Sequence, residues 1–514
     1  MPTHFAVIGI DIGTTSTKAV AFDKTGRVLG AHTASYPLAD PAPGQATQDP
    51  ARIFEAVLEV VRVASAEAGG RCRIAGLAVS SAMHSLIALD DAGQPITPSV
   101  TWADGRASAQ AERLRAAPGG LELHRRTGTP LHPMSPLPKL VWFREVAPEI
   151  FRRARHWVGI KEYVLLRLCG ELVMDWSIAS ATGLLNLEAL DWDEEALSIA
   201  GVTREQLPPL VSTKHVLPAL GADSASATNL PAETPVVVGA GDGALANLGL
   251  GAVRPGVAAC SIGTSGALRV VVERPAVDPR GRVFCYALAP GRWVVGGAIN
   301  NGGVVLEWAG EALARDLGEG SYQELLAEAA EVPPGSGGLL MLPYLLGERA
   351  PHWSSLPRGA YVGLTRGHRR RHLVRAALEG VCLQLDLVLR SMEAAGNEVH
   401  EIRATGGFAQ SELWKQMLAD ALGMEIGFPA GHEGSSFGAA LLGMEALGIV
   451  ESFDVAADLV HIDHTVKPDP DAAATYDALL PVFADLYDAL VPTFQSLREL
   501  APNLPLDDAG GDRT

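Results

Sequence analysis

The fold is decided near the start of the chain, by the segment Phe5-Ala-Val-Ile-Gly-Ile-Asp-Ile-Gly-Thr-Thr-Ser-Thr-Lys-Ala-Val-Ala-Phe-Asp23. Its two apolar runs, residues 5–10 and 18–22, predict a pair of strands. Between them, Gly13 allows a tight turn and a close approach to a ligand, because glycine has no Cβ. The turn also carries many hydroxyl donors, at Thr14, Thr15, Ser16 and Thr17. Such a loop suits the terminal phosphates of a nucleotide, although an ordinary β-hairpin with a Gly-Thr turn has the same residues.

Asp11 stands at the end of the first predicted strand, directly before this turn. Mg²⁺ prefers one or two carboxylates together with phosphate oxygens and water. Asp11 is therefore the candidate metal ligand, either directly or through a water molecule. The acid and the turn together are interpreted as one candidate site for a metal-bound nucleotide.

A second segment repeats this design of strand, Ile-Gly-Thr turn and strand; it reads Val257-Ala-Ala-Cys-Ser-Ile-Gly-Thr-Ser-Gly-Ala-Leu-Arg-Val-Val-Val272. Gly263 and Thr264 align with Gly13 and Thr14 at a constant offset. A repeat this long predicts two related domains rather than a solenoid. Ser261 stands where the first copy has Asp11, so only the first turn carries an acid that could bind a metal.

Composition limits the class of protein. With 514 residues, 47% of them hydrophobic, the chain can bury large cores, and its length predicts two to four domains. The net charge of −18 argues against nucleic acid and anionic membranes as partners. The five cysteines show no zinc or redox spacing, which favours a reduced, cytoplasmic protein. Neither a signal peptide nor a membrane span is expected.

Two loops that follow predicted strands supply candidate substrate residues. After the third strand, residues 28–35, Asp49-Pro50 opens a helix to about residue 67, and a strand at 74–80 gives the order β-β-β-α-β. Loops at strand ends often bind ligands, which makes candidates of His84, Trp102, Asp104 and Arg106. Each also has a simpler explanation: a hydrogen-bonded histidine, or a local Asp104–Arg106 ion pair at a helix start. The following proline-rich stretch, residues 127–139, is expected to lack regular structure.

Asp242 lies in the segment Gly239-Ala-Gly-Asp-Gly-Ala-Leu-Ala-Asn247, after a strand at 235–238. The glycine spacing imitates a dinucleotide-binding fingerprint, which also needs an acid about twenty residues later. Residues 243–272 contain no Asp or Glu, so that reading fails. A carboxylate between two glycines on a strand-to-helix turn is a candidate general base, and it could also cap the helix. Because the chain has no Gly-x-x-x-x-Gly-Lys-Ser/Thr sequence, a P-loop is excluded.

The glycines and proline of residues 248–256 predict a hinge between two domains, at 1–249 and 250–501. The second domain is expected to hold helices at about 372–395, 412–422 and 434–447. The tail 502–514 is expected to be disordered. The basic run at 366–372 is interpreted as a solvated helix entrance.

Three further segments carry a resemblance to a known family. Gly359-Ala-Tyr-Val-Gly-Leu364 followed by His372-Leu-Val-Arg-Ala-Ala-Leu-Glu379 resembles the C-terminal signature of the FGGY carbohydrate kinases, and Met134-Ser-Pro-Leu-Pro-Lys-Leu-Val-Trp142 resembles the N-terminal one. This family is a branch of the actin-like ATPases. The resemblance implies an α/β fold of two ribonuclease-H-like domains with a central cleft. It also implies ATP and Mg²⁺ as cofactors and phosphorylation of a sugar or polyol hydroxyl.

Carried over by position, the resemblance assigns roles to individual residues. Asp242 looks like the catalytic base, and Asp11 like the metal ligand. The residues that look like nucleotide contacts are Gly13, Thr14, Thr15, Ser16, Lys18, Gly263, Thr264, Gly303, Gly406, Gly407 and Ser411. Those that align with sugar-binding segments are Met83, His84, Trp102, Asp104 and Arg106. Lys161, His84 and Arg106 are the candidate cations for an acidic substrate.

Within the family, Ser-Ala-Met-His-Ser at 81–85 and Thr-Trp-Ala-Asp-Gly-Arg at 101–106 look most like gluconokinase segments. The expected reaction converts D-gluconate to 6-phosphogluconate. Xylulokinase, which converts D-xylulose to xylulose 5-phosphate, is the alternative, although Ser81 and Ser85 depart from its Gln-Met-His-Gly loop. An actin-like ATPase without sugar kinase activity is the alternative from another class. The expected partner is a small sugar or sugar acid; the oligomeric state stays open, with a homodimer as one option.

Overall fold

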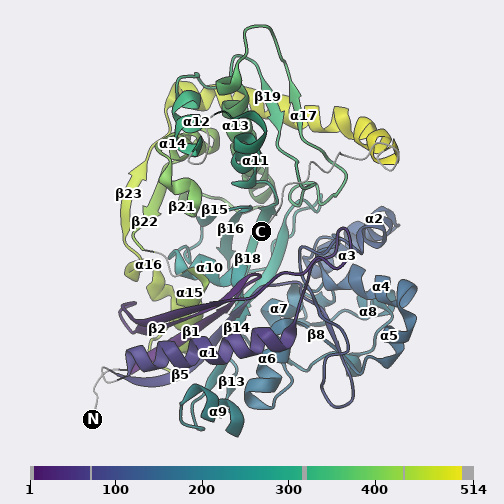
Figure 1. Ribbon diagram of the computed structural model, residues 1–514, viewed down its shortest axis with the longest axis vertical. Helices are drawn as coiled ribbons and strands as arrows, with labels where there is room; N and C mark the ends of the chain where they lie inside the picture. The colour runs from purple at the N-terminus through teal and green to yellow at the C-terminus, as the bar shows by residue number, and fades with distance from the viewer. Residues whose placement is uncertain (1–4, 70–71, 315, 317–320, 432–433, 501–514) are drawn as a thin grey trace.

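The computed structural model describes residues 5–69, 72–314, 316, 321–431 and 434–500 (Figure 1). Two large mixed sheets, each with its own helices, form the two halves of the molecule. This confirms the predicted α/β fold with two sheet-containing domains. The expected disordered tail, residues 502–514, lies outside the described residues. Over the described part of the chain, no helix is both long enough and apolar enough to cross a membrane.

The first sheet is built on the opening hairpin. Strand β1 pairs antiparallel with β2 and parallel with β5, and the strand order is β13-β14-β5-β1-β2-β3. The bounds are β1 (Phe5–Ile12), β2 (Ser16–Asp23), β3 (Val28–Ser35), β5 (Arg73–Ser81), β13 (Val216–Leu217) and β14 (Val236–Gly241). Helix α1 (Pro50–Ala68) begins as predicted, because the Asp49 side chain accepts a hydrogen bond from the Ala51 N–H.

The second sheet repeats the first. Its order is β17-β18-β16-β15-β21-β22-β23, so β18-β16-β15-β21-β22-β23 matches β3-β2-β1-β5-β14-β13 strand for strand. Both series end in an antiparallel edge strand. The bounds are β15 (Val257–Ile262), β16 (Gly266–Val272), β17 (Phe284–Ala289), β18 (Arg292–Ile299), β21 (Glu401–Thr405), β22 (Ile426–Pro429) and β23 (Ile462–Val466). The duplication inferred from the two Ile-Gly-Thr turns is confirmed.

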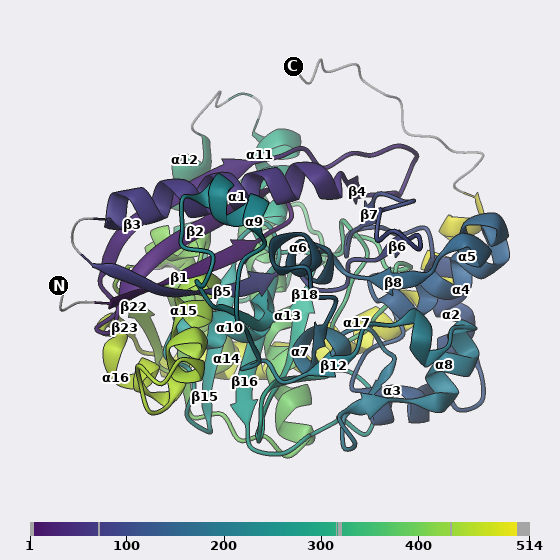
Figure 2. The same cartoon turned by 90° about the horizontal axis from the view of Figure 1, so that it is seen from below.

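Helix α15 (Gly434–Ala446) connects the halves, because it comes from the second half of the chain and packs on β1 and β5 of the first sheet. Helix α1 covers the opposite face of that sheet (Figure 2). The approach requires glycine: a Cβ at Gly9 would lie 1.9 Å from the carbonyl oxygen of Ser436. Helix α15 also packs against α10 (Asp242–Gly249), where a Cβ at Gly438 would lie 2.0 Å from the Leu245 carbonyl. The halves therefore interlock around Asp242.

Two regions differ from the sequence-based expectation. The stretch expected to be irregular contains the start of helix α4 (Pro136–Val146), because proline at the first turn of a helix loses no hydrogen bond. Helix α17 (Pro470–Leu500) was not anticipated, since Pro481 and Pro492 interrupt its pattern. The predicted helices near 372–395, 412–422 and 434–447 are confirmed as α13 (Arg370–Ala394), α14 (Glu412–Leu422) and α15.

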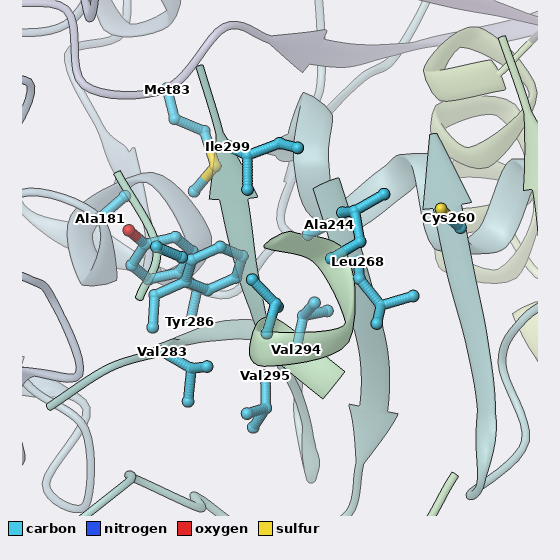
Figure 3. Close-up of a cluster of buried hydrophobic side chains, with 14 of the residues drawn as sticks. Met83, Ala181, Ala244, Cys260, Leu268, Val283, Tyr286, Val294, Val295 and Ile299 are labelled. Carbon is cyan, nitrogen blue, oxygen red and sulfur yellow. The ribbon is translucent and has the colours of Figure 1, made fainter. Parts of the chain in front are cut away.

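An apolar core continues across the junction between the halves (Figure 3). Met83, from the loop after β5, lies near Tyr286 of β17, and both belong to one buried cluster. Ala244 of α10 and Leu268 of β16 belong to the same cluster. Buried apolar side chains from both halves therefore pack together in the region around Asp242.

Candidate active site

A cavity of about 240 Å³ lies between the halves and brings several predicted residues together. Met83, His84, Trp102 and Asp242 all line it, as does Thr14 of the first turn. The second half contributes Ser265, Arg269, Tyr286 and Arg349, among other residues. Residues far apart in the chain thus form one small, partly polar chamber next to the predicted phosphate turns.

Asp242 is the first residue of α10, directly after β14. Its Oδ1 accepts a hydrogen bond of 2.6 Å from the Gly243 N–H. Burial, followed by the charge of Asp11, raises the pKa of Asp242 to about 6, against the opposing effect of Arg269. A carboxylate with a pKa close to neutrality is well matched to accept a proton from a hydroxyl group.

The first turn carries a second acid. Asp11 Oδ1 accepts a hydrogen bond of 2.7 Å from the Ser80 hydroxyl of the neighbouring strand. Burial raises the pKa of Asp11, while Ser80 and the charge of Lys18 oppose the shift. Among the described residues, no cluster of three or more His, Cys, Asp or Glu side chains could hold a metal ion by itself. A metal at Asp11 would therefore need oxygen ligands from a bound phosphate or from water.

Trp102 and Lys139 fix the loops that line the cavity. The Trp102 indole N–H donates to Thr14 Oγ1 over 2.8 Å, which ties the predicted sugar segment to the first turn. The buried Lys139 ammonium donates to the carbonyls of His84 at 2.7 Å, Thr101 at 2.7 Å and Met134 at 2.8 Å. Burial lowers the pKa of Lys139 to about 7, against the opposing charge of Asp104. One side chain thus holds three loops in register.

His84 lines the cavity but cannot act as the expected cation. Its Nδ1 donates to the Ala181 carbonyl over 2.8 Å, which leaves Nε2 as an acceptor. Burial lowers the pKa of His84 to about 3, so the ring is neutral at physiological pH. A neutral imidazole acceptor suits a hydroxyl of the substrate rather than its carboxylate.

Arg106 and Asp104 form the local ion pair that the sequence left open as an alternative. Arg106 Nε and Nη2 each donate to the Asp104 carboxylate over 2.8 Å, and Asp104 Oδ2 also accepts from the Ala46 N–H. The Arg106 guanidinium lies over the Trp142 ring, with its Cζ 5.1 Å from the centroid. Neither residue lines the 240 Å³ cavity. Asp104 nevertheless lines a neighbouring cavity of about 420 Å³ together with Trp102 and Arg349. In this structure the ion pair holds the Trp102 loop, and its contact with substrate stays a prediction.

Lys161 differs from expectation in the same way. Its ammonium nitrogen lies 2.6 Å from Asp175 Oδ2, and both side chains are fully buried. The residue does not line the 240 Å³ cavity. A buried ammonium needs a counter-charge, and Asp175 supplies it, so Lys161 is not available to a substrate.

A larger cavity, of about 700 Å³, lies on the far side of the second turn. Five of the predicted nucleotide residues line it: Gly263, Thr264, Gly303, Gly407 and Ser411. Leu306, Leu326, Phe408 and Trp414 give it an apolar wall suited to a planar base. Gly406, just before it, has a φ of 117°, and a Cβ there would lie 2.2 Å from the Ile262 carbonyl. The Ser411 hydroxyl caps α14 by accepting from the Trp414 N–H.

The second turn connects this cavity to the chamber around Asp242. Thr264 lines the larger cavity and Ser265 lines the smaller one. The Gly303 N–H donates to the Gly263 carbonyl over 2.6 Å, which holds the start of helix α11 (Val304–Leu313) against the turn. The arrangement therefore places two hairpin turns between a base-sized cavity and a chamber containing a carboxylate.

Sequence reasoning missed Arg269 and Arg349, which bring positive charge to the smaller cavity. Arg349 lies over the Trp102 ring, with its Cζ 4.9 Å from the centroid, and donates to the Ile299 carbonyl over 2.9 Å. A signal for Arg269 was present, because it is the single charged residue within the otherwise apolar strand Gly266–Val272. Arg349 lies in a loop, and nothing in its local sequence points toward the cavity.

Comparison with known proteins agrees with the family resemblance found in the sequence. Residues 6–249 match the model of the FGGY family of carbohydrate kinases, N-terminal domain, and residues 258–447 match that of its C-terminal domain. The gluconokinase of Bacillus subtilis is 44% identical over 93% of this chain and 95% of its own length. The xylulose kinase of Lactococcus lactis is 31% identical over the same shares. The crystal structure of gluconate kinase from Lactobacillus acidophilus superposes with a TM-score of 0.92 at 35% identity, covering 96% of this chain and 100% of the other.

The chain belongs to the FGGY family of carbohydrate kinases. It is a carbohydrate kinase, and membership implies ATP as the co-substrate. The alternative of an actin-like ATPase without sugar kinase activity loses its support, because the family models cover both halves of the chain.

Proposed function

We propose that this protein is a gluconokinase that transfers the γ-phosphoryl group of ATP to the C6 hydroxyl of D-gluconate. The observation that carries the proposal is the 44% identity to a gluconokinase over nearly the whole chain, against 31% to a xylulose kinase. The chemistry of the smaller cavity agrees with it, since two guanidinium groups line the space beside Asp242. A neutral ketose would need neither of them.

In the proposed reaction, Asp242 acts as the general base. The C6 hydroxyl gives its proton to the Asp242 carboxylate while its oxygen attacks the γ-phosphorus, and ADP leaves. The Gly243 N–H holds Asp242 Oδ1 at 2.6 Å and so fixes the orientation of the carboxylate. Neutral His84 accepts a hydrogen bond from a substrate hydroxyl through Nε2. Phosphoryl transfer depends mostly on positioning and electrostatics, which these contacts supply.

We propose further that the nucleotide spans the two turns, with its base in the 700 Å³ cavity and its phosphates between Gly13-Thr14 and Gly263-Thr264. Thr15, Ser16 and Lys18 complete the first turn. Asp11 fits Mg²⁺, because it is a partly buried carboxylate with a raised pKa beside the phosphate turn, and a cation would relieve the cost of its charge. When bound, Mg²⁺ would neutralise charge on the phosphates.

Residues 1–249 and 250–501 are proposed as the two domains, with a hinge at 248–256. Closure around both substrates would exclude water and limit wasteful ATP hydrolysis. Small-angle scattering is expected to give a smaller radius of gyration with gluconate and a non-hydrolysable nucleotide than without them. A cytoplasmic location is also proposed, supported by five free cysteines, four of them buried.

The decisive experiment compares kcat/KM for gluconate, xylulose, ribulose and glycerol with ATP and Mg²⁺ under one assay condition. Gluconate is expected to exceed every neutral substrate by at least about tenfold, which corresponds to one well-made charged contact. A neutral sugar that wins by tenfold or more would remove the gluconate proposal and leave only the family. Xylulose as that winner would establish the alternative.

A further inference from the structure

We propose that Arg269, with Arg349 beside it, binds the carboxylate of the substrate and is the residue that selects sugar acids over neutral sugars. The inference rests on the proposed function, because it assumes a substrate that carries a carboxylate. It replaces Lys161, Arg106 and His84, the cations that the sequence suggested, since two of these are paired elsewhere and the third is neutral. The residues that line the 240 Å³ cavity include two with a permanent positive charge, Arg269 and Arg349.

Arg269 lies in a slot that two glycines keep open. It stands on β16, opposite Gly296 of β18 in the sheet register. A Cβ at Gly296 would lie 3.0 Å from Arg269 Cγ, so the missing side chain leaves room for the aliphatic part of the arginine. A Cβ at Gly243 would lie 3.3 Å from Arg269 Nε, so the guanidinium rests against the turn after Asp242. The surroundings thus direct the side chain into the cavity, alongside the turn after Asp242.

The charge distribution favours an anion at this place. Burial, and after it the charge of Arg269, lowers the pKa of Arg349 to about 10, against the opposing charges of Glu348 and Asp242. Burial also lowers the pKa of Arg269, against the opposing charge of Asp242, which lies too far away for an ion pair. Among the ion pairs of the described residues, neither arginine is joined to a carboxylate within 4.0 Å, and Arg349 Nε is buried without a hydrogen-bond partner. Two guanidinium groups so close together are stabilised by an anion that both can contact.

A carboxylate fits this place better than the transferred phosphoryl group does. The phosphate turn at Gly263–Ser265 precedes β16, and Arg269 lies four residues beyond Ser265. At about 3.3 Å per residue, its backbone is roughly 13 Å along the strand from that turn. Arg269 lines the smaller cavity together with His84, Phe284 and Tyr286, and it does not line the 700 Å³ cavity proposed for the base.

The test compares the wild type with Arg269→Gln and Arg269→Lys on gluconate and on glucitol, its neutral analogue of equal length. Arg269→Gln is expected to raise KM for gluconate about 10- to 100-fold, the loss of one charge-assisted contact, with kcat changed much less. Its kcat/KM for glucitol should stay within about twofold of the wild-type value or rise. Arg269→Lys should recover part of the gluconate affinity. Arg371→Gln, an exposed residue paired with Glu331, is the matched control and should change the kinetics of neither substrate.

Calorimetric titration with gluconate in the absence of nucleotide measures binding apart from turnover. Together, the binding and kinetic measurements separate the possible results. A loss of gluconate affinity in Arg269→Gln, with glucitol unaffected, supports the proposal. Equal losses of kcat on both substrates would mean that Arg269 serves the phosphoryl group, which overturns it. If the wild type prefers another sugar acid and still depends on Arg269, gluconate is wrong as the substrate and the arginine assignment stands. If the wild type prefers gluconate and Arg269→Gln binds it normally, the proposed function stands and this inference fails.

Discussion

The two hairpin turns share a backbone and differ in charge. Both run strand, Ile-Gly-Thr, strand, are antiparallel and hold the same position in their sheets, although the first loop is one residue longer: Ile12 pairs with Thr17, and Ile262 with Gly266. The first has Asp11 before its turn, where the second has Ser261. In the strand after the turn, the second has Arg269, which pairs with Ala259, where the first has Val20, which pairs with Gly9. Differences at two positions thus give one copy an acid and the other a cation, while the fold is preserved.

This difference extends to the whole cleft. Asp11 and Asp242, the acids whose charges interact, both come from the first half of the chain. Arg269 and Arg349 come from the second half. On the roles proposed above, the duplicated fold divides the work of the reaction: one half would supply the base and the metal-side acid, and the other the anion-binding groups. Single substitutions should disturb each half separately.

The largest effect is expected for Asp242→Asn. The amide cannot accept the proton of the attacking hydroxyl, so kcat should fall by about 10²- to 10⁴-fold. Affinity for ATP, measured by titration, should stay nearly unchanged. The melting temperature of the variant at pH 7 should be equal to that of the wild type or higher. The wild type loses stability as pH rises from 3.8 to about 6, because Asp242 has a raised pKa in the folded state, and the neutral amide avoids this loss. A variant that keeps more than a tenth of wild-type kcat would show that another group is the base.

The pH profile of the wild type tests the same assignment without a mutation. Asp242 accepts a proton only as the carboxylate, and its raised pKa is about 6. Below about pH 6, kcat should therefore fall about tenfold for each unit of pH. A flat profile between pH 5 and 7 would argue against a base with this pKa.

A smaller loss is expected for Asp11→Asn, and almost none for Ser261→Ala at the equivalent place in the second copy. Removing a carboxylate that supports Mg²⁺ should lower kcat/KM by about 10²-fold and raise the Mg²⁺ concentration needed for half-maximal rate. Ser261 has no carboxylate, so its loss should leave the Mg²⁺ dependence unchanged. Equal effects at both positions would contradict the assignment of the metal to the first turn.

The main strands, helices and repeated turn could be predicted from the sequence because their signals are local. Hairpin turns, the Asp49 cap and the alternating strands follow from neighbouring residues, and the duplicated turn fixed the two-domain architecture. Arg349 could not be found in this way, because its position over Trp102 depends on how the two halves pack. Lys161 was misread for the matching reason: its partner Asp175 becomes its neighbour only in the folded protein. Helix α17 was missed because its packing outweighs the cost of two interior prolines.

Lys139→Met tests whether the loops of the first half need their shared anchor. Methionine keeps the length and apolar character of the buried stem but donates no hydrogen bonds, so three carbonyls lose their donor. KM for the sugar substrate should rise about tenfold, while KM for ATP should change little, because the carbonyls that Lys139 contacts, those of His84, Val100, Thr101 and Met134, lie on the side of the predicted sugar segments. Lys139→Arg is the conservative comparison. An unchanged sugar KM in Lys139→Met would show that the loops are fixed by other contacts.

The smallest effect is expected where the halves meet at the surface. Arg498 of α17 donates to Glu112 of helix α2 (Ser108–Ala116) over 2.8 Å, but both side chains are substantially exposed, 46% and 32%. Water and salt screen such a pair, so Arg498→Ala should cost less than about 1 kcal/mol of unfolding free energy, and less still at high salt. The contrasting variant is Gly438→Ala, whose new Cβ would lie 2.0 Å from the Leu245 carbonyl inside the α10–α15 contact. Denaturant unfolding should show a clear loss only for Gly438→Ala. If Arg498→Ala were the more damaging change, the halves would be held together by their surface charges rather than by the packing of helix α15.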